Sequence, residues 1–239
     1  MSKLGTLYML PCPIDDNGEV WDVLPEANRK IMSSLDYFIV ENCRSARRFL
    51  SKAALGLKID ELEFRELNEH TTRGAEVEEL IKPLMEGRSA GVISEAGVPG
   101  VADPGALVVE LCHRRGVRVV PLVGPSSIIL AVMASGLNGQ SFAFNGYLPI
   151  KPNERQRAIR QFEHRARSER QSQLFIEAPY RNLKLMEQLL QVCQPDTLLT
   201  VAMDITAESE YIKTKRVAEW RKTALPDMQR RPAIFILGI

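Results

Sequence analysis

Residues that build metal sites and disulfide frameworks are scarce in this sequence. Its 239 residues include 4 cysteines and 3 histidines, and no two cysteines form a Cys-x-x-Cys pair. Structural zinc sites and disulfide-rich secreted domains depend on such closely spaced ligands. We therefore expect a reduced, cytoplasmic protein without a metal cofactor.

Long apolar runs are also absent. No stretch approaches the ~18 apolar residues of a membrane-spanning helix. The opening MSKLGTLYMLPCP holds too short an apolar run for a signal peptide. Neither sign of charge is in excess, since 31 basic and 30 acidic residues leave a net charge of +1. We expect no membrane contact and no overall electrostatic bias towards nucleic acid.

What the first part of the chain does have is an alternation of short apolar runs and amphipathic stretches. The apolar runs predict strands at 6–10, 37–40, 61–67, 91–93 and 117–122. The amphipathic stretches predict helices at 25–35, 44–54, 74–85, 106–115 and 127–134. Strands that alternate with helices over short connections predict a mostly parallel sheet covered on both faces.

The pattern changes near residue 147. A connector with Pro149 and Pro152 leads into a highly charged helix at 151–170, and a second strand-rich unit follows. Its predicted strands are at 174–176, 198–202, 211–215 and 233–237. The sequence thus predicts an α/β fold with two α/β domains, 1–146 and 147–239.

The segment SEAGVPGVADPG at 94–105 is the most informative part of the chain. Its three glycines and two prolines predict a rigid, tightly turned loop whose backbone amides can approach a ligand. Ligands of parallel α/β sheets bind beyond the carboxyl ends of strands, where this loop lies. Neither GxGxxG nor a P-loop motif occurs, so the ligand is not a standard dinucleotide or P-loop nucleotide. A helix start with Asp103 as N-cap and Pro104 as first helical residue is the alternative, and both roles can coexist.

Similar turns follow other predicted strands. Ser126 and Ser127 follow a Gly-Pro turn, where they either cap the next helix or meet the polar end of a ligand. A third turn, EAPYR, lies at 177–181, and a Pro-Cys-Pro segment follows the first strand at 11–13. Together these turns predict a cleft between the domains.

The helix at 151–170 carries seven basic and three acidic residues. One interpretation is contact with RNA phosphates. The other is a solvated helix face with internal ion pairs, and the sequence leaves both open.

Five segments, in order along the chain, match a known family. They are GTLYMLPCPI, VISEAGVPGVADPG, VRVVPLVGPSSI, FAFNGYLPIK and LFIEAPYRNLKLM. The chain resembles the tetrapyrrole methylase superfamily, and most closely its ribosomal RNA branch, the small-subunit cytidine 2′-O-methyltransferases. The resemblance implies two α/β domains with S-adenosylmethionine in the cleft between them, usually in a homodimer. It also implies methylation of a ribose in small-subunit ribosomal RNA.

The same resemblance assigns roles to residues of both halves. It places around the cofactor Pro13, Gly97, Pro99, Val101, Ala102, Asp103, Ser126, Ser127, Ile176, Glu177, Ala202, Met203 and Ala233. A ribose hydroxyl must also lose its proton, and Asp103 and Glu177 are the candidate catalytic bases. Arg44 and Arg181 are candidates to hold a phosphate.

This chain departs from the branch where acceptor specificity would be set. The branch patterns PIGNL, AEDTR and ELTK correspond here to PIDDNG at 13–18, VENCR at 40–44 and DITA at 204–207. Two alternatives to ribosomal RNA methylation therefore stay open. One is methylation of a tetrapyrrole or another small molecule, and the other is a non-catalytic module that binds S-adenosylmethionine or RNA.

Overall fold

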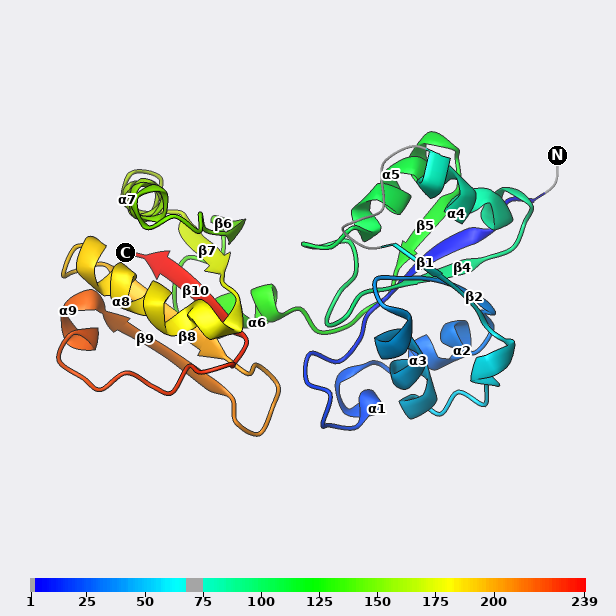
Figure 1. Cartoon of the computed structure of the whole chain (residues 1–239), viewed down its shortest axis with the longest axis horizontal. Coiled ribbons are helices and arrows are strands. Elements are labelled where there is room, and N and C mark those ends of the chain that lie inside the picture. The colour runs from blue at the N-terminus through cyan, green and yellow to red at the C-terminus, as the bar shows by residue number, and fades with distance from the viewer. Residues whose placement is uncertain (1–2, 68–74) are drawn as a thin grey trace. The chain divides into compact units, whose positions relative to one another are not determined.

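The structure, a computed structural model, describes residues 3–67 and 75–239 (Figure 1). Gly74, the predicted first residue of a helix, lies outside the described residues. The chain forms two compact units, Met1–Ser126 and Ser127–Ile239. Each unit contains one five-stranded sheet, so the predicted α/β fold with two α/β domains is confirmed.

The sheet of the first unit is parallel throughout, in the order β3-β2-β4-β1-β5. Its strands are β1 (Thr6–Leu10), β2 (Tyr37–Val40), β3 (Glu63–Glu66), β4 (Ala90–Ile93) and β5 (Arg118–Pro121). All five predicted strands of this unit are present, with ends shifted by a few residues.

Helices cover both faces of this sheet because its strands alternate two apolar faces. Leu7 and Met9 of β1 pack on one face, with α4 (Ala75–Met85) and α5 (Gly105–Arg114). Leu10 packs on the opposite face, which is covered by α1 (Val20–Val23), α2 (Ala27–Met32) and α3 (Cys43–Lys52). Figure 1 shows α4 and α5 on one side of the sheet and α1 to α3 on the other.

The second unit has a mixed sheet in the order β6-β7-β10-β8-β9. The strands are β6 (Phe142–Tyr147), β7 (Ser172–Ile176), β8 (Leu198–Met203), β9 (Tyr211–Arg216) and β10 (Ala233–Gly238). β6 and β7 are parallel, and the other pairs are antiparallel. The helices are α6 (Ser127–Ser135), α7 (Pro152–Ser168), α8 (Asn182–Val192) and α9 (Val217–Trp220).

Strand β10 lies at the centre of this unit and has two buried faces. Ala233, Phe235 and Leu237 pack in a core with residues of α7, α8 and α9. Ile234 and Ile236 point to the opposite face and pack with α6. Within the described part of the chain, no helix has the length and apolar character to cross a membrane.

The boundary between the units differs from the one that the sequence predicted. The prediction places it near residue 147, whereas the units meet between Ser126 and Ser127. The difference arises because α6 packs on the second sheet and because β6, which has no continuous apolar run, pairs with β7. Both contacts join residues far apart in the sequence, so local patterns do not reveal them.

Phe235 tests the core of the second unit. Its fully buried ring stacks on Phe175 with the ring centroids 6.0 Å apart. We predict that Phe235→Ala lowers the free energy of unfolding by about 3–5 kcal/mol, because it leaves a cavity. The exposed residue Ile239 is the control, and Ile239→Ala should change the free energy of unfolding by less than about 0.5 kcal/mol. Urea unfolding followed by circular dichroism measures both, and equal effects would contradict this description of the core.

Candidate active site

The loops after β1, β2, β4 and β5 meet at one edge of the first sheet. In a parallel sheet all carboxyl ends lie at the same edge, and here the loops also contact one another. The Cys12 N–H donates to the Gly97 carbonyl at 2.8 Å, and the Glu95 N–H donates to Glu41 Oε2 at 3.1 Å. A Cβ atom on Gly97 would lie 3.4 Å from the Pro125 carbonyl oxygen. Four segments that are distant in sequence therefore form one surface.

The predicted ligand loop at 94–105 has an unusual backbone. Gly97, Gly100 and Ala102 have φ angles of +69°, +84° and +62°. Such angles are easy for glycine but cost a residue with a Cβ about 1–2 kcal/mol. Gly97 and Pro99 are buried, whereas Val101 and Ala102 are exposed. The buried pair therefore shapes the loop, and the exposed pair is the part that a ligand can reach.

Asp103 fastens this loop to the helix that follows. Its Oδ2 accepts a hydrogen bond from the Gly100 N–H, and its Oδ1 accepts one from the Gly105 N–H, each at 2.7 Å. The predicted helix start is shifted by one residue, since Pro104 is the N-cap and Gly105 opens α5. Asp103 still stabilises the first turn of α5, so it shapes the loop and supports the helix start together.

The loop after β5 packs directly on the loop after β1. A Cβ atom on Gly124 would lie 2.2 Å from Cβ of Pro11, so only glycine fits there. The Asn28 side chain donates to the Val123 carbonyl at 2.8 Å. Ser126 ends the first unit and Ser127 opens α6 in the second, so these two predicted contact residues belong to different compact units.

The predicted cofactor residues of the second unit gather at one end of its sheet. The register pairs Ala233 with Met203, and Ile234 with both Ala202 and Ile176. The side chains of Ala202, Met203 and Ala233 are buried in the core. Their backbone at the strand ends, rather than their side chains, is therefore what a ligand could meet.

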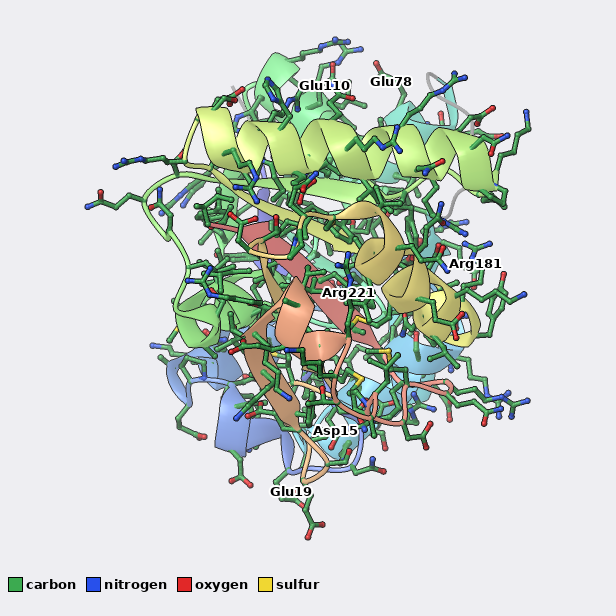
Figure 2. All side chains as sticks on the ribbon, turned by 90° about the vertical axis from the view of Figure 1, so that its left-hand side faces the viewer. Asp15, Glu19, Glu78, Glu110, Arg181 and Arg221 are labelled. Atoms are coloured by element: carbon green, nitrogen blue, oxygen red, sulfur yellow. The ribbon has the colours of Figure 1, made fainter. Side chains whose placement is uncertain are left out.

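Glu177 follows β7 at this same end and is held by arginines. Its side chain is fully buried, and Oε1 accepts hydrogen bonds from Arg181 Nε and Nη2 at 2.9 and 2.5 Å. Oε2 lies 4.0 Å from Arg155 Nη1 and has no hydrogen-bond partner among the described residues. Arg181, labelled in Figure 2 at the start of α8, is thus held in place by a buried carboxylate.

Charges on α7 divide into an inner and an outer set, which the sequence could not distinguish. Arg155 is buried and its Nε donates to Gln188, while Arg167 pairs with Asp196 at 2.6 Å. Arg157 and Arg160 are exposed, and within residues 3–67 and 75–239 neither has an ion-pair partner. The basic surface of this helix is therefore smaller than its composition indicates.

A small pocket of about 50 Å³, which no pattern in the sequence indicates, lies between the β1 loop and α3. Pro13, Asp15, Asp16 and Glu95 line it together with Ser45, Arg48 and Lys52 of α3. Arg48 Nη2 lies 2.5 Å from Asp16 Oδ2, and Lys52 Nζ donates to the Asp16 carbonyl at 2.5 Å. The PIDDNG segment that departs from the ribosomal RNA branch therefore contacts α3, which begins at Cys43 within the departing VENCR segment.

The cysteines take no part in this geometry as reactive groups. All four are free thiols, and burial raises the pKa of Cys12, Cys43, Cys112 and Cys193. In the part of the chain that the structure describes, no group of three His, Cys, Asp or Glu side chains is placed to hold a metal ion.

Asp103 gives this site a measurable pH dependence. Burial raises its pKa above the ordinary value of 3.8, against backbone N–H groups that lower it. The folded chain therefore holds this proton more tightly than the unfolded chain, and ionisation costs stability as the pH rises. We predict that Asp103→Asn gains unfolding free energy relative to the wild type as the pH rises from below 3.8 towards neutrality.

Urea unfolding of both proteins across this range measures the difference. Asp196 is a control of opposite sign, since Arg167 lowers its pKa. Relative to the wild type, Asp196→Asn should lose stability over the same range. A wild-type–variant difference at Asp103 that does not change with pH would contradict the prediction.

Comparison with known proteins identifies relatives along nearly the whole chain, although no family model matches it. Ribosomal RNA small subunit methyltransferase I of Xylella fastidiosa (strain Temecula1) is 30% identical over 237 residues, which cover 99% of this chain and 82% of that protein. The protein of the same name from Vibrio cholerae serotype O1 is 29% identical over 231 residues, with 97% and 75% covered.

Solved structures show the same fold at lower identity. The methyltransferase CobJ matches with a TM-score of 0.62 and 17% identity, over 98% of this chain and 94% of that chain. Uroporphyrin-III-C-methyltransferase from Thermus thermophilus matches with a TM-score of 0.53 and 18% identity, over 98% and 92%. The fold is thus that of the tetrapyrrole methylases. Because identity reaches 30% across 99% of the chain, the chain is a methyltransferase that belongs to the ribosomal RNA small subunit methyltransferase I family.

Proposed function

We propose that this chain transfers a methyl group from S-adenosylmethionine to a ribose 2′-hydroxyl in small-subunit ribosomal RNA. The observation that carries the proposal is the similarity to relatives named for that RNA, which spans 99% of the chain. We further propose that the enzyme works in the cytoplasm, as its few cysteines and short apolar runs indicate, and that it is a homodimer, as the resemblance to the superfamily implies.

The residues at the strand ends fit S-adenosylmethionine, which supplies a methyl group already activated on a sulfonium sulfur. The exposed residues Val101 and Ala102 can meet such a ligand, and Asp103 holds the loop that carries them through Gly100 and Gly105. The proposed contact residues are those that the resemblance assigns: Pro13, Gly97, Pro99, Val101, Ala102, Asp103, Ser126, Ser127, Ile176, Glu177, Ala202, Met203 and Ala233.

The main task of the protein in such a reaction is alignment. Fixed reacting groups can lower a barrier by up to about 7–11 kcal/mol, and a loop tied down at Gly97, Gly100 and Gly105 suits that task. Of the two candidate bases, Asp103 uses both oxygens to hold backbone N–H groups. Asp103 is nevertheless only half-buried, whereas the Glu177 carboxylate is fully buried and bound by Arg181. We therefore propose Asp103 as the better candidate to accept the hydroxyl proton.

The exposed arginines of α7 support an RNA acceptor. Arg157 and Arg160 lie one helical turn apart on the outer face of the helix. Exposed cations without carboxylate partners attract phosphates, because binding them releases counterions from the nucleic acid. Arg181, by contrast, is paired with Glu177. A phosphate contact through Arg181, which the sequence suggested, therefore has less support than a contact through Arg157 or Arg160.

Methyl transfer to ribosomal subunits tests the proposed function. We predict that the protein transfers label from methyl-tritiated S-adenosylmethionine to small ribosomal subunits from a strain that lacks it. Label should appear in one RNA fragment that resists alkaline cleavage at that site, because a 2′-O-methyl group blocks the attacking hydroxyl.

A variant with a distorted cofactor loop is the control for this experiment. Gly97→Val should bind no S-adenosylmethionine in calorimetry and transfer no label, because valine is strained at a φ of +69°. Wild-type cofactor binding without any RNA label would contradict the RNA acceptor and favour a small molecule. Absence of cofactor binding by the wild type would contradict the methyltransferase proposal itself.

Charge reversal on α7 tests the RNA contact separately. We predict that Arg157→Glu with Arg160→Glu raises the KM for ribosomal subunits roughly tenfold or more, because phosphate contacts are lost. Cofactor affinity should not change. The matched control is Lys213→Glu with Lys222→Glu, which makes the same change in net charge at two other exposed positions of the second unit. Equal KM values for the two double variants would contradict a specific contact through α7.

A further inference from the structure

Two tyrosines at one end of the second sheet are far more exposed than aromatic residues usually are. Tyr147 ends β6 and is 64% exposed, and Tyr180 lies in the turn after β7 and is 73% exposed. Tyr147 is in register with Ile176, the last residue of β7. Because β6 and β7 are parallel, both tyrosines lie at the carboxyl end of these strands, where α/β proteins bind ligands.

Arg181 lies over one of the two rings. Its guanidinium carbon is 5.2 Å from the centroid of the Tyr180 ring. Its pKa is raised, first by the hydrogen bond to Glu177. A cation anchored to a buried carboxylate therefore lies against the exposed Tyr180 ring.

The turn beside Tyr180 is held in place. The fully buried Glu177 carboxylate binds Arg181 at 2.5 Å, and Pro179 begins the short helix that carries Tyr180. A tyrosine side chain has few rotatable bonds, so it loses little conformational freedom when a flat ligand stacks on it. Two exposed tyrosines at one strand end favour a binding surface over a packing role.

Basic residues adjoin this surface. The first turn of α7 lies beside the Glu177 turn, since the Pro152 carbonyl accepts from Gln188 Nε2 at 2.9 Å and Arg155 Nη1 is 4.0 Å from Glu177 Oε2. Arg157 follows within the next turn and is exposed. The exposed Lys184 lies in the first turn of α8, close in sequence to Tyr180 and Arg181. Cations around stacking rings are the combination that binds single-stranded nucleic acid.

We propose that Tyr147 and Tyr180 form a stacking platform for unpaired bases of the acceptor RNA. The proposal rests on the function proposed above and adds that the acceptor is bound as a single strand, with bases turned out against the two rings. In duplex RNA the bases are stacked within the helix and are not free to do this. The two tyrosines would thereby select a loop or an unpaired segment over a helix.

The experiment measures binding of a short fluorescein-labelled oligoribonucleotide, single-stranded or as a duplex, by fluorescence anisotropy. We expect Tyr147→Ala and Tyr180→Ala each to weaken single-strand binding roughly fivefold to 100-fold, which is the usual effect of losing one stacked base. Duplex binding should change little. The loss should be the same at every salt concentration, because no cation is removed.

Conservative variants separate stacking from simple apolar contact. Tyr180→Phe and Tyr147→Phe should keep near wild-type affinity, whereas Tyr180→Leu and Tyr147→Leu should lose it. The control is Phe142→Ala, which removes a 36% exposed ring from the opposite end of β6. Wild-type affinity of the alanine or the leucine variants would overturn the proposal.

Two further outcomes separate this inference from its alternatives. Sedimentation of the same variants tests whether the tyrosines instead join two copies of the chain, and loss of a dimer with unchanged RNA affinity would overturn the proposal. Methyl transfer to subunits by the wild type is measured in parallel. Transfer that is insensitive to both tyrosine changes would overturn the platform and leave the proposed function standing. Tyrosine-dependent RNA binding without any transfer would support the platform and contradict the proposed function.

Discussion

Parallel pairing of β1, β2, β4 and β5 is the constraint on which the candidate active site depends. It brings four loops to one edge of the sheet, although long stretches of chain separate them. It also requires both sheet faces to be covered, which explains the alternation of Leu7 and Met9 with Leu10 in the two cores. The hydrogen bond from Cys12 to Gly97 and the close packing of Gly124 on Pro11 then bring these loops into direct contact with one another.

In each unit, one carboxylate fixes a turn at the strand ends. In the first unit Asp103 bridges two backbone N–H groups, and in the second the buried Glu177 is held by Arg181 and approached by Arg155. A buried carboxylate is costly unless it is paired and hydrogen-bonded. The partners are therefore fixed along with it, and the segments that carry them become rigid. Rigidity of this kind suits methyl transfer, in which the electrophile is already activated and alignment is the remaining demand.

The second unit shows how mixed pairing builds a different kind of edge. Antiparallel β10 lies between β7 and β8, so its first residues meet the last residues of both neighbours. β6, by contrast, runs parallel to β7 and delivers Tyr147 beside the turn that carries Tyr180. The β10 and β8 side of this sheet end thus presents backbone with buried side chains, while the β6 and β7 side presents two exposed tyrosines.

The sequence by itself determined the strands with continuous apolar runs, the glycine- and proline-rich loop and the membership of the ribosomal RNA small subunit methyltransferase I family. These features depend on local composition and short spacing, which a linear pattern contains. It did not reveal β6, because the strand Phe142–Tyr147 is only half-buried at a sheet edge and is defined by its pairing with β7. The unit boundary was misplaced for the same reason.

Only the tertiary structure decided which charges are available. Arg155 and Arg157 look alike in the sequence, but Arg155 turns inward to Gln188 and Glu177 while Arg157 stays in solvent. The difference depends on partners from β7 and α8, which reach α7 only after the chain has folded. A long-range contact likewise brings Asp16 to Arg48, and no pattern along the chain encodes such distances.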